Sequence, residues 1–340
     1  MRKRIIPIIF AILAASFYAV NIPLSKLLMN DIAPTMMAGL LYLGAGIGIG
    51  IMFLFKVKKT PKEELLNKND LPYVLGMIAL DIAAPILLMF GIRGTTSGNA
   101  SLLNNFEIVA TSLIALIIFK EAISKKLWIA IVLVTISSAL LTFDISSLEF
   151  TWQSLLILGA AICWGFENNC TRKISSKSSY EIVTIKGLCC GIGSIVIGLI
   201  VGEKFPLSIY LLYALLLGFV AYGLSIFFYI KAQAKLGAAK TSAFYAVNPF
   251  IGVILSLIIF KEIPTWNFYI ALAIMLAGAV LIIIDTLERR HTHVHTHVIT
   301  HTHDGTTHTH VIEHSHPHNH FKDEENHTHK HLHLKTHENV

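Results

Sequence analysis

The chain has 340 residues, of which 54% are hydrophobic and only 14% are charged. A soluble domain carries about 25% charged residues, so the surplus of apolar residues needs a second apolar solvent, and a lipid bilayer provides one. The formal net charge is +6, with −3 in residues 291–340 and +9 in residues 1–290. The basic residues of the body stand singly or in short runs between apolar segments, which excludes a nucleic-acid-binding patch.

Ten apolar runs reach or approach the length of about 20 helical residues that a bilayer core requires. They lie at 5–29, 35–55, 71–92, 98–119, 127–143, 154–174, 180–201, 207–230, 239–260 and 266–284. The first run resembles a signal peptide, but it continues to Met29 with no hydrophilic mature segment after it, so we expect a transmembrane helix. The runs lack period-2 alternation and therefore predict helices. The predicted fold class is an all-α integral membrane protein with ten transmembrane helices.

Lysine and arginine are distributed unevenly between the two sets of alternate connections. If the N-terminus is cytoplasmic, the inside connections hold 19 of these residues and the outside connections hold only three, which are Arg93, Lys204 and Lys261. Cytoplasmic loops of membrane proteins carry such an excess. The pattern predicts an even number of spans, both termini in the cytoplasm, and a location in the cell membrane.

The sequence also repeats itself. The segment 117–121 recurs as 258–262, and this offset of 141 places Glu107 against Asn248. The first spans of the two halves align at an offset of 146. The predicted organisation is a first repeat at 1–144, a second at 145–288 and a tail at 289–340. Five spans per repeat is an odd number, so the two repeats have inverted topology, which suits a transporter that alternates between two access states.

The residues that carry these repeats resemble the EamA-type domain of the drug/metabolite transporter superfamily. The best match runs from Tyr229 to Glu262 and includes a Leu-Gly-Ala-Ala turn, the pair Asn248-Pro249 and a terminal Glu262. The family has glycine where this chain has Lys261, and the first repeat matches more loosely. The resemblance covers about residues 5–285. It implies a central cavity between two inverted five-helix repeats, and it leaves the substrate open.

Three carboxylates fall near the middle of predicted spans, where a charged group is costly and commonly marks function. They are Asp81, Glu107 and Glu167. A low-dielectric environment favours the neutral form of a carboxyl group, so these groups are candidates for proton exchange and for coupling transport to a proton gradient. We expect Asp81 and Glu107 to line the transport path.

Other polar residues within the spans have two readings each. Asn21, Asn104, Asn168 and Asn248 either line the path or hydrogen-bond between helices. Lys26 and Lys186 either pair with a carboxylate or an anionic substrate, or extend to the membrane interface. Pairs of glycines four residues apart, including Gly46 with Gly50 and Gly187 with Gly191, predict close helix packing. The four cysteines all lie in apolar runs and predict no disulfide.

All 17 histidines lie in the tail, between His291 and His337, mostly in alternation with other residues. Imidazole suits Zn, Ni, Co and Cu, and zinc takes about four ligands. The tail therefore predicts binding of transition-metal ions by a chain that is disordered without them. A pH-responsive tail is the alternative. The predicted metal ligands are His291, His293, His295, His297, His301, His303, His308, His310, His314, His316, His318, His320, His327, His329, His331 and His333.

Three functions fit these observations. The first is a secondary transporter, most simply an exporter, of a small organic solute. The second is a transporter of a metal ion or metal–chelate complex with the tail as sensor or donor. The third is a membrane metal sensor that transports nothing. The chain has no HExxH, GxSxG or P-loop motif, so neither an enzyme nor a cofactor requirement is predicted. Lipid, a small-molecule substrate and transition metals are the predicted partners, nucleic acid is excluded, and a homodimer is left open.

Overall fold

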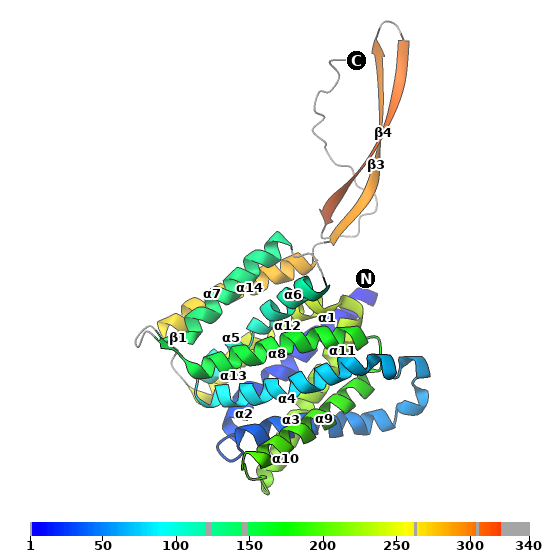
Figure 1. Cartoon of the computed structure of the whole chain (residues 1–340). Coiled ribbons are helices and arrows are strands. Elements are labelled where there is room, and N and C mark those ends of the chain that lie inside the picture. Colours follow the sequence, from blue (N-terminus) through cyan, green and yellow to red (C-terminus); the bar gives the residue numbers. More distant parts are fainter. Residues whose placement is uncertain are drawn as a thin grey trace. The chain divides into compact units, whose positions relative to one another are not determined.

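The computed structural model describes residues 2–119, 124–144, 149–261, 264–287, 289–303 and 306–320. The chain divides into two compact units, Met1–Ile283 and Ile284–Val340. The first unit is a bundle of helices (Figure 1). The second contains a two-stranded antiparallel hairpin.

The first repeat contains five long helical segments, two of which are interrupted, and three short 3-10 turns. Its elements are α1 (Arg2–Ala19), α2 (Asn21–Leu28), α3 (Pro34–Leu54), η1 (Val57–Lys59), η2 (Lys62–Glu64), η3 (Lys68–Asp70), α4 (Leu71–Arg93), α5 (Ser97–Leu103), α6 (Phe106–Phe119) and α7 (Lys125–Thr142). A short strand pair, β1 (Phe143–Asp144) and β2 (Glu149–Phe150), then precedes the second repeat.

The second repeat follows the same order. Its elements are α8 (Trp152–Ile174), α9 (Ser179–Ile200), α10 (Ile209–Leu217), η4 (Gly218–Leu224), α11 (Ser225–Leu236), α12 (Ala238–Tyr245), α13 (Asn248–Phe260) and α14 (Trp266–Leu287). The segment η4 is a π-helix. It continues α10 into α11, so the predicted span at 207–230 is one helix with a wider turn in its middle.

Seven helices in the described part of the chain are long and apolar enough to cross a membrane. They lie at Ile6–Leu28, Pro34–Leu54, Lys62–Arg93, Ser97–Ile118, Ser179–Ile200, Ile209–Leu236 and Trp266–Asp285. A shorter apolar helix spans Asn248–Phe260. The two remaining predicted spans correspond to α7, which has 18 residues with two lysines at its start, and α8, which carries Glu167, Arg172 and Lys173. The count of ten spans therefore stays a prediction.

Three helices that the sequence predicts to be continuous are interrupted, and prolines explain two of the interruptions. A proline cannot donate to the carbonyl four residues earlier and clashes with it. Helix α1 ends at Ala19, four residues before Pro23, and α12 ends at Tyr245, four residues before Pro249. The break between α5 and α6 at Asn104–Asn105 has no proline, yet it occupies the matching place in the first repeat.

The helix contacts come in equivalent pairs, each related to the other by interchange of the two repeats. Helix α1, the first of its repeat, packs against α11 in the third span of the other repeat, and α8 packs against α4 in the same way. Likewise α6 packs against α8, and α13 packs against α1 and α2. Each repeat therefore completes its packing with the other.

Helices α3 and α9 approach each other backbone to backbone. A methyl group added at Gly187 would lie 2.3 Å from the backbone nitrogen of Gly46, and one added at Gly46 would lie 2.5 Å from the nitrogen of Leu188. Such distances leave no room for a side chain. The close helix packing that the glycine pairs predicted is therefore present.

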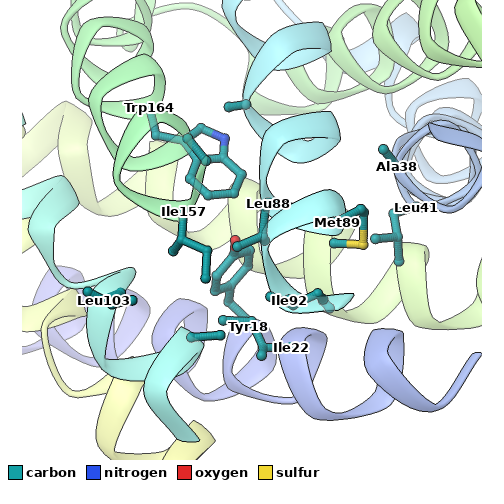
Figure 2. Close-up of a cluster of buried hydrophobic side chains, with 14 of the residues drawn as sticks. Tyr18, Ile22, Ala38, Leu41, Leu88, Met89, Ile92, Leu103, Ile157 and Trp164 are labelled. Carbon is teal, nitrogen blue, oxygen red and sulfur yellow. The ribbon is translucent and has the colours of Figure 1, made fainter. Parts of the chain in front are cut away.

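The bundle has a buried core and an apolar exterior. Figure 2 shows part of the core, where Leu88 and Met89 of α4, Ile157 and Trp164 of α8 and Tyr18 of α1 gather. Large apolar side chains also cover the outside: Leu54 is 71% exposed and Ile200 is 78% exposed. Exposed apolar surface on this scale is suited to lipid tails.

The second unit contains the tail. Residues Arg289–His303 form β3 and residues Thr306–His320 form β4, and the two strands pair antiparallel. The expectation that the tail is disordered without metal stays a prediction. The alternation of histidine with threonine and valine has the period of a strand, and β-branched residues favour strands. The register sets histidine opposite histidine at His291/His318, His293/His316, His295/His314 and His301/His308. Residues 321–340 lie outside the described residues.

Candidate functional site

A cavity lined by aromatic and polar side chains lies where the two repeats meet, and its empty volume is about 480 Å³, open mouth included. Both repeats contribute to its wall, from α1, α3 and α6 on one side and from α8, α9, η4, α11 and α12 on the other. Its aromatic residues are Tyr18, Tyr42, Trp164, Tyr222, Tyr229 and Tyr245. Its polar residues are Glu107, Glu167, Asn168, Thr171, Lys186 and Ser225.

Lys186 sits between two carboxylates. Its Nζ atom lies 2.8 Å from Oδ2 of Asp81 and 2.8 Å from Oε1 of Glu167, and all three side chains are at most 4% exposed. The hydroxyl of Thr171 also donates to Glu167. Charges this deeply buried persist only when they are paired, and here one ammonium group serves two carboxylates. Lys186 is therefore a partner of two carboxylates, and its role in a substrate path stays a prediction.

Glu107 has a neutral partner. Its Oε1 atom accepts a hydrogen bond of 2.6 Å from Nδ2 of Asn168, and the same amide group lies 3.3 Å from the Thr111 hydroxyl. The backbone oxygen of Asn168 accepts from Nε2 of Gln233 at 3.0 Å. Helices α6, α8 and α11 are therefore joined at Glu107, whose carboxylate has no cationic partner in any ion pair of the described residues.

The first helices of the two repeats carry the same hydrogen-bond motif. The Ser25 hydroxyl donates to Oδ1 of Asn21 at 2.9 Å, and at the offset of 146 the Thr171 hydroxyl donates to Glu167. Nδ2 of Asn21 also donates to the Tyr222 hydroxyl at 3.3 Å. Asn21 thus binds helices together, as the hydrogen-bonding reading predicted, and it touches a cavity residue in doing so.

The remaining predicted residues lie away from the cavity wall. The ammonium of Lys26 donates to the backbone oxygen of Thr95 and stands 5.5 Å from the ring centre of Phe260. Asn104 is buried at the break between α5 and α6, and Asn248 is buried at the start of α13. Asp81 contacts the cavity through Lys186 rather than lining it. The expectation that Asp81 lines the transport path stays a prediction.

Sequence reasoning missed the aromatic wall. The rings of Tyr18 and Trp164 meet edge to face at 6.1 Å, and these residues are equivalent at the offset of 146 (Figure 2). Tyr222 lies at the offset of 141 from Asp81. The sequence signal for this wall is that equivalent positions of the two repeats carry aromatic or charged residues. Such positions lie where the two repeats meet.

The structure does not test the predicted metal ligands of the tail. Among the described residues, no group of three or more His, Cys, Asp or Glu side chains is placed to hold a metal ion. His327, His329, His331 and His333 lie outside the described residues, and for the histidines of β3 and β4 the description extends to backbone pairing.

Comparison with known proteins identifies the family. The profile of the EamA-like transporter family matches residues 5–143 and again residues 151–284. An uncharacterized transporter of Methanothermobacter thermautotrophicus is 27% identical over 284 residues, which is 76% of this chain and 81% of that protein. The uncharacterized transporter YyaM of Bacillus subtilis is 24% identical over 260 residues, 71% of this chain and 80% of that protein.

A solved crystal structure shares the fold. It superimposes with a TM-score of 0.63 at 13% identity and covers 82% of this chain and 96% of the other. Two family matches, one for each repeat, agree with the exchange of equivalent helix contacts between the repeats. The chain is a multi-pass membrane protein and a member of the EamA-like transporter family.

Proposed function

We propose that the protein is a secondary transporter that exports a small organic solute through the central cavity by alternating access. The observation that carries the proposal is the cavity with the ionisable side chains Glu107, Glu167 and Lys186, which is lined by both repeats inside a bundle whose exterior is apolar. Ionisable groups inside a membrane protein are costly to maintain and commonly mark a path for solutes. The chain spans the cell membrane ten times, and both termini are cytoplasmic.

Alternating access is supported by the way the repeats exchange partners. The contacts of α1 with α11 and of α8 with α4 are related by exchange of the repeats, as expected for inverted repeats with domains at 1–144 and 145–288. The fourth helix of each repeat is broken at the matching place. Discontinuous helices near the midplane are typical of transporter binding sites.

Hydrogen bonds join the two repeats near one set of span ends. Oγ of Ser256 donates to Oγ of Ser97 at 2.8 Å, and Glu203 accepts from the backbone nitrogens of Thr35 and Met36 at the start of α3. These residues lie toward the span ends that the positive-inside pattern assigns to the outside. These contacts support the proposal that the protein can close on the outside and receive its solute from the cytoplasm.

The test compares solute release by cells that express the wild-type chain, Asp81→Asn, Glu107→Gln or a control. Glu64→Gln is a matched control because it makes the same chemical change at an exposed position of η2. Metabolite profiles of the medium should show one or more solutes enriched by the wild type and by the control, and reduced in both cavity variants. Equal profiles from cells with and without the protein would contradict the proposal.

The tail is a second candidate site, and its strand register supports a role in binding metal. Four positions of the hairpin register pair a histidine with a histidine, and imidazole is a suitable ligand for Zn²⁺ and Ni²⁺. Calorimetric titration of the full chain with Zn²⁺ or Ni²⁺ should give micromolar or tighter binding at neutral pH. A chain that ends at residue 288 should give none, and equal heats from both chains would reject the site.

A further inference from the structure

The aromatic residues of the cavity form a connected chain of rings. Tyr18 is the centre, with ring centres 6.1 Å from Trp164, 5.5 Å from Tyr222 and 5.9 Å from Tyr245. Tyr42 extends the chain from Tyr222 at 4.9 Å. The face of an aromatic ring carries partial negative charge and attracts cations. A wall of this composition therefore favours a positively charged or aromatic guest.

The charges at the site add to this preference. Lys186 is the single cationic side chain among the described residues that line the cavity, and its ammonium group is already paired with Asp81 and Glu167. With Glu107 included, three carboxylates face one ammonium group, which gives −2 if all four ionise. An anionic guest would meet a cation that is already neutralised, whereas a cationic guest would meet the unpaired carboxylate of Glu107.

One hydroxyl group in the wall has room for a further hydrogen bond. The Tyr18 side chain is 6% exposed and lines the cavity, and its hydroxyl group interacts with the hydroxyl group of Tyr222. A phenolic hydroxyl can donate one hydrogen bond and also accept, so the Tyr222 interaction leaves capacity that a bound polar group can use. Tyr18 therefore provides a hydrogen-bonding position beside Glu107 in the same cavity.

We propose that the solute of this cavity is a protonated organic amine. Its ammonium group binds between the aromatic rings and the Glu107 carboxylate, and a polar hydrogen of the solute bonds to the Tyr18 hydroxyl. This inference rests on the proposed transport function and names its substrate class. Glu107 is the residue that sets the sign of the charge that the cavity accepts.

Three probes of nearly the same size and shape separate the possible classes: benzylamine is cationic at neutral pH, benzyl alcohol is neutral and benzoate is anionic. The purified full chain is titrated with each by calorimetry, and quenching of Trp164 fluorescence, absent in Trp164→Phe, locates binding in the cavity. Benzylamine should bind at least about tenfold tighter than benzyl alcohol, since one cation–π or charge contact accounts for such a factor. Benzoate should bind more weakly than either.

Variants then assign the preference to Glu107. Glu107→Gln should remove the advantage of benzylamine over benzyl alcohol, while Glu107→Asp and the exposed control Glu64→Gln should keep it. Thermal unfolding of each variant shows whether it is folded, and the probe comparison on the wild type needs no variant. Equal affinities for the amine and the alcohol, tighter binding of benzoate, or an unchanged preference in folded Glu107→Gln would overturn the proposal.

Movement of the probes across liposome membranes separates this inference from the proposed function. If benzylamine binds as expected but does not cross faster with the protein than without it, the transport function fails and the amine site stands. If benzyl alcohol or benzoate is carried and benzylamine is not, the transport function stands and the amine class fails.

Discussion

At the scale of single residues, Lys186 is the cation on which the buried carboxylates of Asp81 and Glu167 depend. It is 4% exposed, and it is the cation that keeps Asp81 and Glu167 from facing each other as two uncompensated buried charges. Removing one partner of a buried ionic group is far more costly than replacing the whole group by apolar residues. The loss of Lys186 should therefore affect folding before it affects transport.

Lys186→Met is expected to destabilise the protein by about 3–5 kcal/mol, because it leaves two carboxylates without a cation. The triple variant Lys186→Met, Asp81→Asn, Glu167→Gln should recover most of that stability. Thermal unfolding in detergent measures both effects. An unfolding temperature of Lys186→Met equal to that of the wild type would show that the three groups are not coupled as described.

At the scale of elements, the crossing of α3 and α9 fixes the distance between the repeats. The backbones touch at Gly46 and Gly187, where no side chain fits. Glycine in a helix costs about 1 kcal/mol relative to alanine, so its presence here is explained by packing and not by helix propensity.

Gly46→Ala should be destabilising because the new methyl group would lie 2.5 Å from the backbone nitrogen of Leu188. Gly159→Ala is the matched control, since a methyl group there meets only the Leu87 side chain at 3.6 Å, an ordinary contact. The control should be neutral or stabilising by up to about 1 kcal/mol. Thermal unfolding of the two variants should move in opposite directions, and a parallel change would argue against the close crossing.

The broken helix α12/α13 allows a test of whether the interruption serves transport. Pro249→Ala restores a donor four residues after Tyr245 and should make the helix more continuous, with a gain in thermal stability and a loss of transport. Pro61→Ala, in an exposed connection, should change neither. Transport in liposomes and thermal unfolding measure the two effects, and normal transport by Pro249→Ala would show that the break is dispensable.

At the scale of the whole molecule, the topology follows from the count of basic residues in the connections. We expect Lys62→Cys, between α3 and α4, to react with a membrane-impermeant maleimide only after the cells are opened. Lys204→Cys, between α9 and α10, should react in intact cells. The wild type controls for its own four cysteines. The reverse pattern of labelling would invert the proposed orientation.

Much of the fold could be predicted from the sequence because hydrophobic length and glycine spacing act locally along the chain. Seven of the spans, the two repeats and the close helix packing at Gly46 and Gly187 belong to this class. The break at Asn104–Asn105 could not be predicted, because no proline marks it and tertiary contacts decide it. The pairing of Lys186 with Asp81 and Glu167 joins residues on three helices, so no spacing rule contains it. The tail strands were not predicted, because the polar composition of the tail favours a disordered chain, whereas its period-2 alternation favours strands.

The π-helix η4 determines which way the residues of α11 face relative to those of α10 in the same span. A π turn holds one residue more than an α turn and so sets the phase between α10 and α11, while Tyr222, Ser225 and Tyr229 share one face by their helical spacing and line the cavity. One residue corresponds to about 100° of rotation in a regular α-helix. Deleting one residue within Gly218–Leu224 should therefore convert the π turn into an α turn and leave Ser225 and Tyr229 facing the cavity, whereas deleting one residue between Ser225 and Tyr229 would turn Tyr229 away from it.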